Sequence, residues 1–271
     1  MNAGDLPGGL ELCRIAGWNQ VKGDWLTFLQ ANPNGCFVAA DGVRVYGTVT
    51  SIRYDDRFAW VGMVLVHPEN RRQGIGSTLL NKAIESLRDL SCIKLDATPA
   101  GREVYLQEGF RDEYTLSRMI CERPVPIEKE RSIHSMSKSD FDNVLEIDKK
   151  VFGADRSGVL RHFYHSRPDL AFISSDLQGY CFGRQGYLYN HIGPIVANNP
   201  DTAKFLFASA IQHCKEKPVI TDVSHFSAEW NTWLNTLGFV EQRRFIRMYK
   251  GENSFPGIPE KQFSIGGPEF G

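Results

Sequence analysis

The spacing of apolar residues alternates between helix-like and strand-like along the chain, and both halves give a similar series of elements. In the first half, strands are predicted at residues 36–40, 43–52, 60–66, 93–97 and 114–120, and helices at 10–16, 25–30, 78–90 and 99–106. In the second half, strands are predicted at 131–136, 170–174, 179–183, 186–197 and 219–223, and helices at 140–150, 159–164, 202–214 and 228–237. The predicted fold class is α+β (mixed α/β), a twisted sheet flanked by helices.

The end of the first half recurs at the end of the second half. Gly109-Phe110 precedes Arg118-Met119 at the same spacing with which Gly238-Phe239 precedes Arg247-Met248. A repeat of domain size predicts two tandem copies of one fold.

This repeat divides the chain into parts. We expect domains at 1–121 and 131–250, joined by a charged, proline-containing linker at 122–130 and followed by a glycine- and proline-rich tail at 251–271. Within the tail, residues 263–265 are expected to pair as an edge strand, with the first domain as the candidate partner.

Composition narrows the class of protein. The formal net charge is −1 and 42% of the 271 residues are hydrophobic, so we expect a folded, soluble protein without a nucleic-acid or membrane surface. No stretch is long enough to span a bilayer, and the N-terminus has no signal-peptide pattern. The six cysteines are scattered without a C-x-x-C pair, which favours a reducing cytoplasm and argues against a zinc site, so no metal is expected.

The strongest candidate site lies between the strand at 60–66 and the following helix. The junction reads Arg71-Arg72-Gln73-Gly74-Ile75-Gly76-Ser77. A helix N-terminus offers unpaired N–H groups to an anion, glycine lets the backbone approach it, and arginine adds positive charge. The sequence lacks the Gly-Lys-Ser/Thr of the P-loop and the glycine spacing of dinucleotide sites. The alternative is a strand-to-helix turn that binds nothing.

The junction resembles the acyl-CoA-binding motif R/Q-x-x-G-x-G/A of the GNAT acyltransferases, and the element order of the first half is similar to theirs. One departure is that GNAT domains usually begin with a strand, whereas only residues 1–9 precede the first helix here. The resemblance implies two tandem GNAT folds, each with a mixed, mostly antiparallel sheet. It also implies acetyl-CoA as co-substrate, with its pyrophosphate on the N–H groups of residues 72–77 and its pantetheine arm along Val64, Leu65 and Val66.

A second block, Leu95 to Phe110, completes the resemblance. Tyr105 lies four residues before Gly109, where GNAT enzymes often carry a tyrosine near the thioester sulfur. The resemblance implies that Tyr105 protonates the departing thiolate, and the alternative is a tyrosine packed under its helix. Thr98 stands where many relatives have a CoA-contacting asparagine, although it could simply cap the helix. The general base stays open between Asp96, a water relay and a group from the second half.

The second half lacks the corresponding residues. After the strand at 186–197 the chain continues with Asn198-Asn199-Pro200, and Leu234 stands at the position equivalent to Tyr105. We therefore expect no CoA binding of the usual kind there. Candidate acceptor-binding residues are His191 and Asp222 in this half and Trp18 and Trp25 in the first, and for each the alternative is a structural role in the interior.

These features look like a tandem GNAT subgroup with an active N-terminal domain and a diverged C-terminal one. The predicted function is acetyl transfer from acetyl-CoA to a primary amine, without an acyl-enzyme, and the acceptor is expected to be a small molecule. Two alternatives stay open. One is a CoA-binding regulatory or sensor protein with little catalysis, and the other is an acyltransferase that uses a different acyl-CoA or a protein lysine. The amine and the oligomeric state are not specified by the sequence.

Overall fold

The computed structural model describes residues 1–125, 127 and 130–271, so three residues of the predicted linker lie outside the described residues. In the first half the helices are α1 (Leu6–Ile15), α2 (Lys22–Ala31), α3 (Ile75–Ser86) and α4 (Pro99–Gln107), and the strands are β1 (Phe37–Ala40), β2 (Val45–Tyr54), β3 (Phe58–Val66), β4 (Cys92–Ala97) and β5 (Arg111–Cys121). In the second half the helices are α5 (Lys138–Phe152), α6 (Ser157–Ser166), α7 (Pro200–Ile211) and α8 (Ala228–Thr236). Its strands are β6 (Ile133–Ser135), β7 (Phe172–Ser174), β8 (Gly179–Gln185), β9 (Asn190–Ala197), β10 (Val219–Ser224), β11 (Val240–Gly251) and β12 (Gln262–Ser264).

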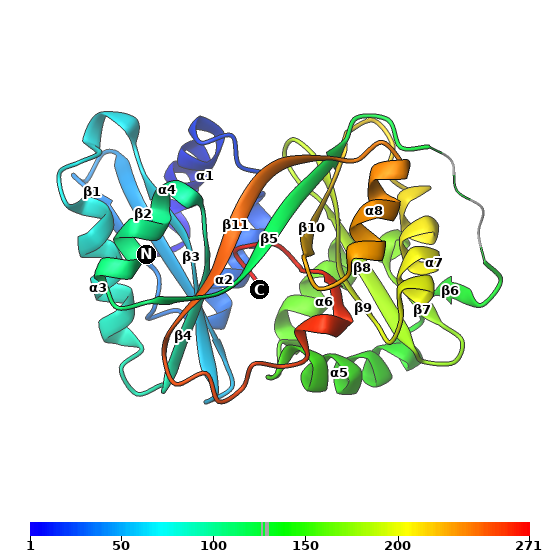
Figure 1. Cartoon of the computed structure of the whole chain (residues 1–271). Coiled ribbons are helices and arrows are strands. Elements are labelled where there is room, and N and C mark those ends of the chain that lie inside the picture. The colour runs from blue at the N-terminus through cyan, green and yellow to red at the C-terminus, as the bar shows by residue number, and fades with distance from the viewer. Residues whose placement is uncertain (126, 128–129) are drawn as a thin grey trace.

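The described strands form one twisted sheet with helices on both faces (Figure 1). Its order is β1-β2-β3-β4-β11-β5-β10-β9-β8-β7-β6, and β12 pairs with β9. The pairs β3–β4 and β9–β10 are parallel, and the neighbouring pairs around them are antiparallel. The predicted fold class is therefore confirmed. Among residues 1–125 no strand precedes α1, and β1 lies at the edge of the sheet.

The two halves exchange their last strands at the centre of this sheet. β11 pairs with β4 of the first half, and β5 pairs with β10 of the second half. β5 and β11 also pair with each other and run side by side between the halves (Figure 1). Side chains of β11 therefore reach the first half. The division into domains at 1–121 and 131–250 remains a prediction from the sequence repeat.

In the first half, β3 and β4 diverge soon after they begin. They pair only at Ala59↔Ile93 and Trp60↔Lys94. Further along β3, Met63 has a φ of 52°, which is unusual for a residue with a side chain, and the facing strand shows a register shift between Thr48 and Thr50. The Thr48 hydroxyl donates a hydrogen bond of 2.8 Å to the Met63 carbonyl and holds this distortion in place. The later part of β3 therefore has no β4 partner, and an opening results.

The equivalent opening in the second half is filled by the tail of the chain. β9 and β10 pair only at Val219↔Asn190 and Ile220↔His191. β12 pairs antiparallel with β9, and Ile265 forms a bridge to Asp222 on β10. The prediction that residues 263–265 form an edge strand against the first domain is therefore wrong. This segment lies between two strands of the second half, because the divergence of β9 and β10 leaves backbone groups there that need partners.

Beyond β12 the tail crosses into the first half and is anchored there. The Tyr54 hydroxyl donates to the Phe270 carbonyl at 2.6 Å, and Trp60 Nε1 donates to the Pro268 carbonyl at 2.9 Å. The buried Phe270 ring packs against Phe28 from the first half and Phe163 from the second, with ring centroids 5.0 Å and 5.3 Å away. The tail thus lies in an apolar core that both halves share.

Candidate active site

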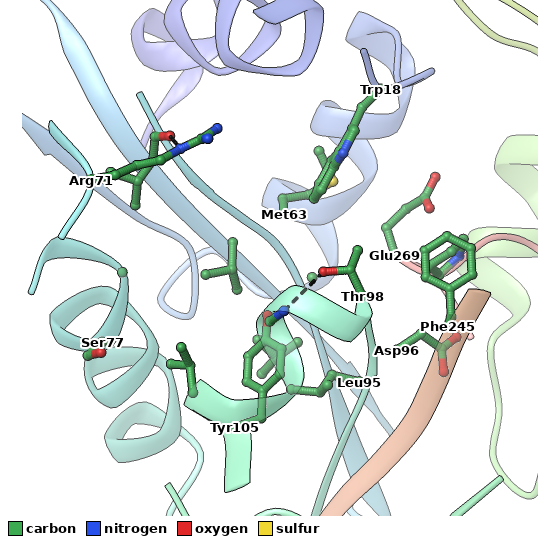
Figure 2. A pocket seen from close by; sticks show the side chains of 18 of the residues that line it. Trp18, Met63, Arg71, Ser77, Leu95, Asp96, Thr98, Tyr105, Phe245 and Glu269 are labelled. Carbon is green, nitrogen blue, oxygen red and sulfur yellow. Dashed lines mark hydrogen bonds between the residues drawn. The ribbon is translucent and has the colours of Figure 1, made fainter. Parts of the chain in front are cut away.

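A pocket with a volume of about 400 Å³ occupies the opening between β3 and β4 (Figure 2). Its first wall comes from β3, the turn before α3 and the start of α4, and its second wall comes from β5, β11 and the tail. The predicted residues that line it are Trp18, Val64, Val66, Arg71, Arg72, Gly74, Ile75, Gly76, Ser77, Thr98 and Tyr105. The structure therefore brings most of the predicted cofactor-binding residues together.

The turn before α3 has the backbone geometry that an anion site needs. Gly74 has a φ of 78° and immediately precedes the helix, whose first residue is Ile75. Glycine adopts this left-handed conformation without strain. No heavy atom beyond the adjoining residues lies within 4 Å of where a Gly74 Cβ would be, and the nearest to a Gly76 Cβ is Val66 Cγ2 at 3.5 Å. Gly74, Ile75, Gly76 and Ser77 line the pocket, and this open space leaves room for an anion beside the first turn of the helix.

Three of the predicted cofactor-binding residues, Arg71, Gln73 and Leu65, do not offer a fully free side chain to the pocket. Arg71 Nε donates a hydrogen bond of 3.2 Å to the Val66 carbonyl, the dashed line at the left of Figure 2, so part of its guanidinium is already engaged. Gln73 does not line the pocket, because its amide donates to the Glu69 carbonyl at 3.4 Å. Leu65 does not line it either, since its side chain is buried in the core. Gln73 and Leu65 can therefore serve a ligand only through their backbones.

Tyr105 and Thr98 both belong to α4 or its cap. The Thr98 hydroxyl accepts a hydrogen bond of 3.2 Å from the Gly101 N–H, so it caps the helix while lining the pocket. The Tyr105 ring packs edge-on against Phe110, with centroids 5.9 Å apart. Burial raises the pKa of Tyr105 to about 12. Within the described part of the chain its hydroxyl has no hydrogen-bond partner, which leaves it free for a ligand.

The predicted acceptor-binding residues separate into two groups. Trp18 lines the pocket, whereas Trp25 is fully buried against Gly9 of α1. His191 and Asp222 are also fully buried and lie outside the pocket lining. Asp222 accepts two hydrogen bonds of 2.7 Å from Arg118, which gives it a structural partner.

His191 makes the stability of the protein depend on pH. Its Nε2 lies 3.4 Å from Asp222, but burial outweighs that carboxylate and lowers its pKa from 6.5 to about 3. Because the unfolded chain takes up a proton below pH 6.5 and the folded chain does not, this residue should cost about 2 kcal/mol of stability between pH 7 and pH 5. We expect His191→Gln to lose that part of the pH dependence in urea unfolding at the two pH values. An unchanged dependence would contradict the assignment.

The sequence analysis assigned to the site none of the lining residues that come from β5, β11 or the tail. They are Arg118, Arg243, Phe245, Pro268 and Glu269. The sequence repeat contained one indication that β5 and β11 matter, because it includes two matching arginines, Arg118 and Arg247. Each binds a carboxylate on the opposite strand: Arg118 binds Asp222, and Arg247 binds Asp96.

The pocket is lined by two carboxylates, Asp96 and Glu269. Both oxygens of Asp96 are engaged by Arg247, at 2.8 Å and 2.9 Å. Glu269 is bonded to Arg184 through Oε1 only, and among the described residues Oε2 accepts no hydrogen bond. A Cβ at position 62 would lie 3.2 Å from the Glu269 Cα, so Gly62 allows the tail to approach β3 closely. Glu269 is therefore the available carboxylate.

Comparison with known proteins agrees with this geometry. Residues 12–110 match the acetyltransferase (GNAT) family, and residues 144–264 match a second acetyltransferase (GNAT) domain. The chain belongs to the GNAT superfamily of acetyltransferases and carries two GNAT domains in tandem. The predicted family is thus confirmed.

Three relatives show how far the likeness extends. A holothin acyltransferase from Pseudoalteromonas sp. (strain SANK 73390) is 24% identical over 242 residues, which are 87% of this chain and 81% of that protein. A Pyrococcus horikoshii protein assigned as an acetyltransferase has a TM-score of 0.79 at 24% identity, covering 92% of this chain and 85% of its own. A tandem GNAT protein from the clavulanic acid biosynthesis pathway has a TM-score of 0.64 at 15% identity, covering 93% and 97%. The two structures show the shared fold.

Two further properties of the described residues bear on the site. None of their helices is both long and apolar enough to cross a membrane. None of their histidine, cysteine and acidic side chains gather in threes or more in a way that could hold a metal ion.

Proposed function

We propose that this pocket transfers an acetyl group from acetyl-CoA directly to a primary amine of a small-molecule acceptor. The observation that carries the proposal is that three features meet in one cavity. They are the helix N-terminus at α3, a stretch of β3 that has no partner on its β4 side, and the free hydroxyl of Tyr105. The first suits a pyrophosphate, the second an arm that pairs as an added strand, and the third a departing thiolate.

The residues of the first half would hold the donor. Backbone N–H groups of residues 72–77 would bind the pyrophosphate, and the unpaired Arg72 side chain would add charge more freely than Arg71. Backbone groups of Val64, Leu65 and Val66 would align the pantetheine arm, since β4 does not pair with β3 there.

Glu269 would accept the proton that the amine must lose. An alkylammonium group cannot attack a thioester until it is neutral, and Glu269 Oε2 is the unbonded carboxylate oxygen of the pocket. The neutral nitrogen then forms a bond to the acetyl carbon, the carbon–sulfur bond breaks, and the sulfur leaves as a thiolate. The second proton of the nitrogen, which becomes acidic once the new bond forms, passes to solvent. The structure favours Glu269 over Asp96 in this role because Arg247 already engages both oxygens of Asp96.

Tyr105 would stabilise the departing sulfur by a hydrogen bond. Its pKa of about 12 lies well above that of an ordinary thiol, about 8.5, so full proton transfer from Tyr105 to the thiolate is unfavourable. A hydrogen bond needs no such transfer. The thiolate then takes its proton after it has left, and Tyr105 remains neutral throughout.

The second half would complete the acceptor side of this cavity instead of binding a second donor. Its own opening is filled by β12, and its last strand and tail contribute Arg243, Phe245 and Glu269 to the first half's pocket. Walls from both halves favour a small acceptor over a protein lysine. A cytoplasmic location, which the scattered free cysteines favour, is part of the proposal.

Thermal unfolding with and without acetyl-CoA tests the proposal. A ligand that binds only the folded state at 100 times its Kd adds about 2.7 kcal/mol of stability. We expect a rise in Tm for the wild type and none for the double variant Gly74→Glu, Gly76→Glu, whose carboxylates would repel the pyrophosphate. Gly158→Glu is the matched control, because Gly158 is exposed on α6 and has open space around its Cβ position. Absence of a shift in the wild type would overturn acetyl-CoA as the donor.

A further inference from the structure

Arg243 is a cation of the pocket that forms no ion pair within the described residues. It lies on β11, is half-buried and lines the cavity. Among residues 1–125, 127 and 130–271, no carboxylate or hydrogen-bond acceptor contacts its guanidinium. Burial and the neighbouring Arg118 lower the pKa of Arg243, and the opposing effects of Asp222 and Tyr189 do not fully compensate.

The other arginines in this region are all paired. Arg118 binds Asp222 at 2.7 Å, Arg184 binds Asp24 at 3.1 Å, and Arg247 binds Asp96 at 2.8 Å. Each of these three is almost fully buried, and each has its carboxylate supplied by another strand or helix. The fold therefore provides carboxylates for its buried arginines and leaves Arg243 without one.

The position of Arg243 in the sheet lowers the stability of the fold. Arg243 stands directly opposite Arg118 across the β5–β11 pair, and like charges at such positions are destabilising. The pairing also shifts register between Glu241 and Arg243, so an extra residue is inserted into β11. Such bulges redirect side chains and are frequent beside active sites. A bound anion would offset the repulsion between Arg118 and Arg243.

The location of Arg243 separates this anion from the donor. Arg243 is two residues from Phe245, so the two side chains lie on the same face of β11. Figure 2 shows Phe245 and Glu269 on the side of the pocket opposite Arg71 and Ser77. The anion at Arg243 therefore belongs to the acceptor and not to the pyrophosphate of acetyl-CoA.

We infer that the acceptor is an amino carboxylate: its carboxylate binds Arg243 while its amine faces Glu269. This inference rests on the proposed function and names the substrate class of the same site. One guanidinium pairs two-pronged with one planar carboxylate, whose single negative charge balances the positive charge of Arg243. The pocket is also lined by Trp18, Met63 and Phe245, so the side chain of the acceptor is apolar.

Matched pairs of amines test the inference. Each pair consists of an amino acid and the amine that remains when its carboxylate is removed: phenylalanine and phenethylamine, leucine and 3-methylbutylamine, tryptophan and tryptamine. Thiol release from acetyl-CoA gives kcat/KM for each. We expect the amino acid to be favoured in at least one pair by about 10- to 100-fold, the range for a hydrogen-bonded charge pair. Arg243→Gln should remove that preference by raising the KM of the amino acid far more than that of the plain amine.

Two further variants make the result specific. Arg244→Gln is the matched control, because the Arg244 side chain is 67% exposed and pairs with Glu241, and it should keep the preference. Arg243→Lys should restore part of it. Equal use of both members in every pair, or a preference that survives Arg243→Gln, would overturn the inference. So would acetyl-CoA binding by thermal shift without turnover of any pair, whereas absence of acetyl-CoA binding would show that the proposed function itself fails.

Discussion

Replacing Glu269 by glutamine is expected to lower kcat by about 10²- to 10³-fold near pH 7, the range for losing a general base. At that pH a primary alkylamine, with a pKa near the 10.4 of lysine, is on the order of 10⁻³ neutral in solution. Glutamine keeps the shape of the side chain but cannot take the proton. The measurement is thiol release from acetyl-CoA between pH 6 and pH 10, with any amine that the wild type acylates.

The pH profile distinguishes a lost base from a damaged site. As pH rises, solution supplies the neutral amine directly, so the deficit of Glu269→Gln should shrink by about tenfold per pH unit. Arg184 keeps its contact of 3.1 Å with Asp24, so no buried charge is left alone, and the Tm shift with acetyl-CoA should match that of the wild type. Glu260→Gln, an exposed glutamate earlier in the tail, is the control. A deficit that is constant across this pH range would contradict the role of Glu269.

The donor side of the pocket could be predicted because it is local in sequence. β3, the glycine turn and α3 follow one another without interruption, and both the left-handed conformation of Gly74 and the helix N-terminus depend on residues within that stretch. Tyr105 was found from the resemblance to GNAT enzymes, which often carry a tyrosine four residues before the equivalent glycine. The prediction could not say that Leu65 and Gln73 direct their side chains elsewhere, because that depends on the bulge at Met63 and the contact with Glu69.

The acceptor side could not be predicted because it depends on which strands pair. The sequence analysis predicted no strand after the helix at 228–237, so it missed β11, and local patterns do not specify that this strand pairs with β4 and brings Arg243 and Phe245 into the first half. The same exchange places Arg118 beside Asp222, which gives that carboxylate a partner in the interior, away from the pocket. The sequence likewise gave no means to distinguish the pocket-lining Trp18 from the buried Trp25.

The tail gives a physical reason for keeping a second domain that lacks the phosphate turn. β12 fills the opening between β9 and β10, so that half needs no ligand to satisfy the strand edge. The same segment then leads Pro268 and Glu269 across to β3. Under the proposed function, one segment therefore both fills the opening that a second cofactor would need and completes the acceptor side of the first pocket.

Replacing Tyr105 by phenylalanine is expected to lower kcat by about 10²-fold while the Kd for acetyl-CoA stays unchanged. Phenylalanine keeps the edge-on contact with Phe110 and removes only the hydroxyl that would stabilise the departing sulfur. Burial raises the pKa of Tyr105 to about 12, so the hydroxyl stays protonated from pH 6 to pH 10 and the deficit should be the same throughout that range. The measurement is again the pH profile of thiol release.

This constant deficit distinguishes the role of Tyr105 from that of Glu269, because the loss of kcat in Glu269→Gln should become smaller as the pH rises. Tyr46→Phe is the matched control, because Tyr46 lies on β2 outside the pocket lining, and it should leave kcat unchanged. Equal turnover of Tyr105→Phe and wild type would exclude the hydroxyl from the reaction. A deficit that followed the pH in the same way as that of Glu269→Gln would mean that both residues act on the amine, and the departing sulfur would then need another hydrogen-bond donor.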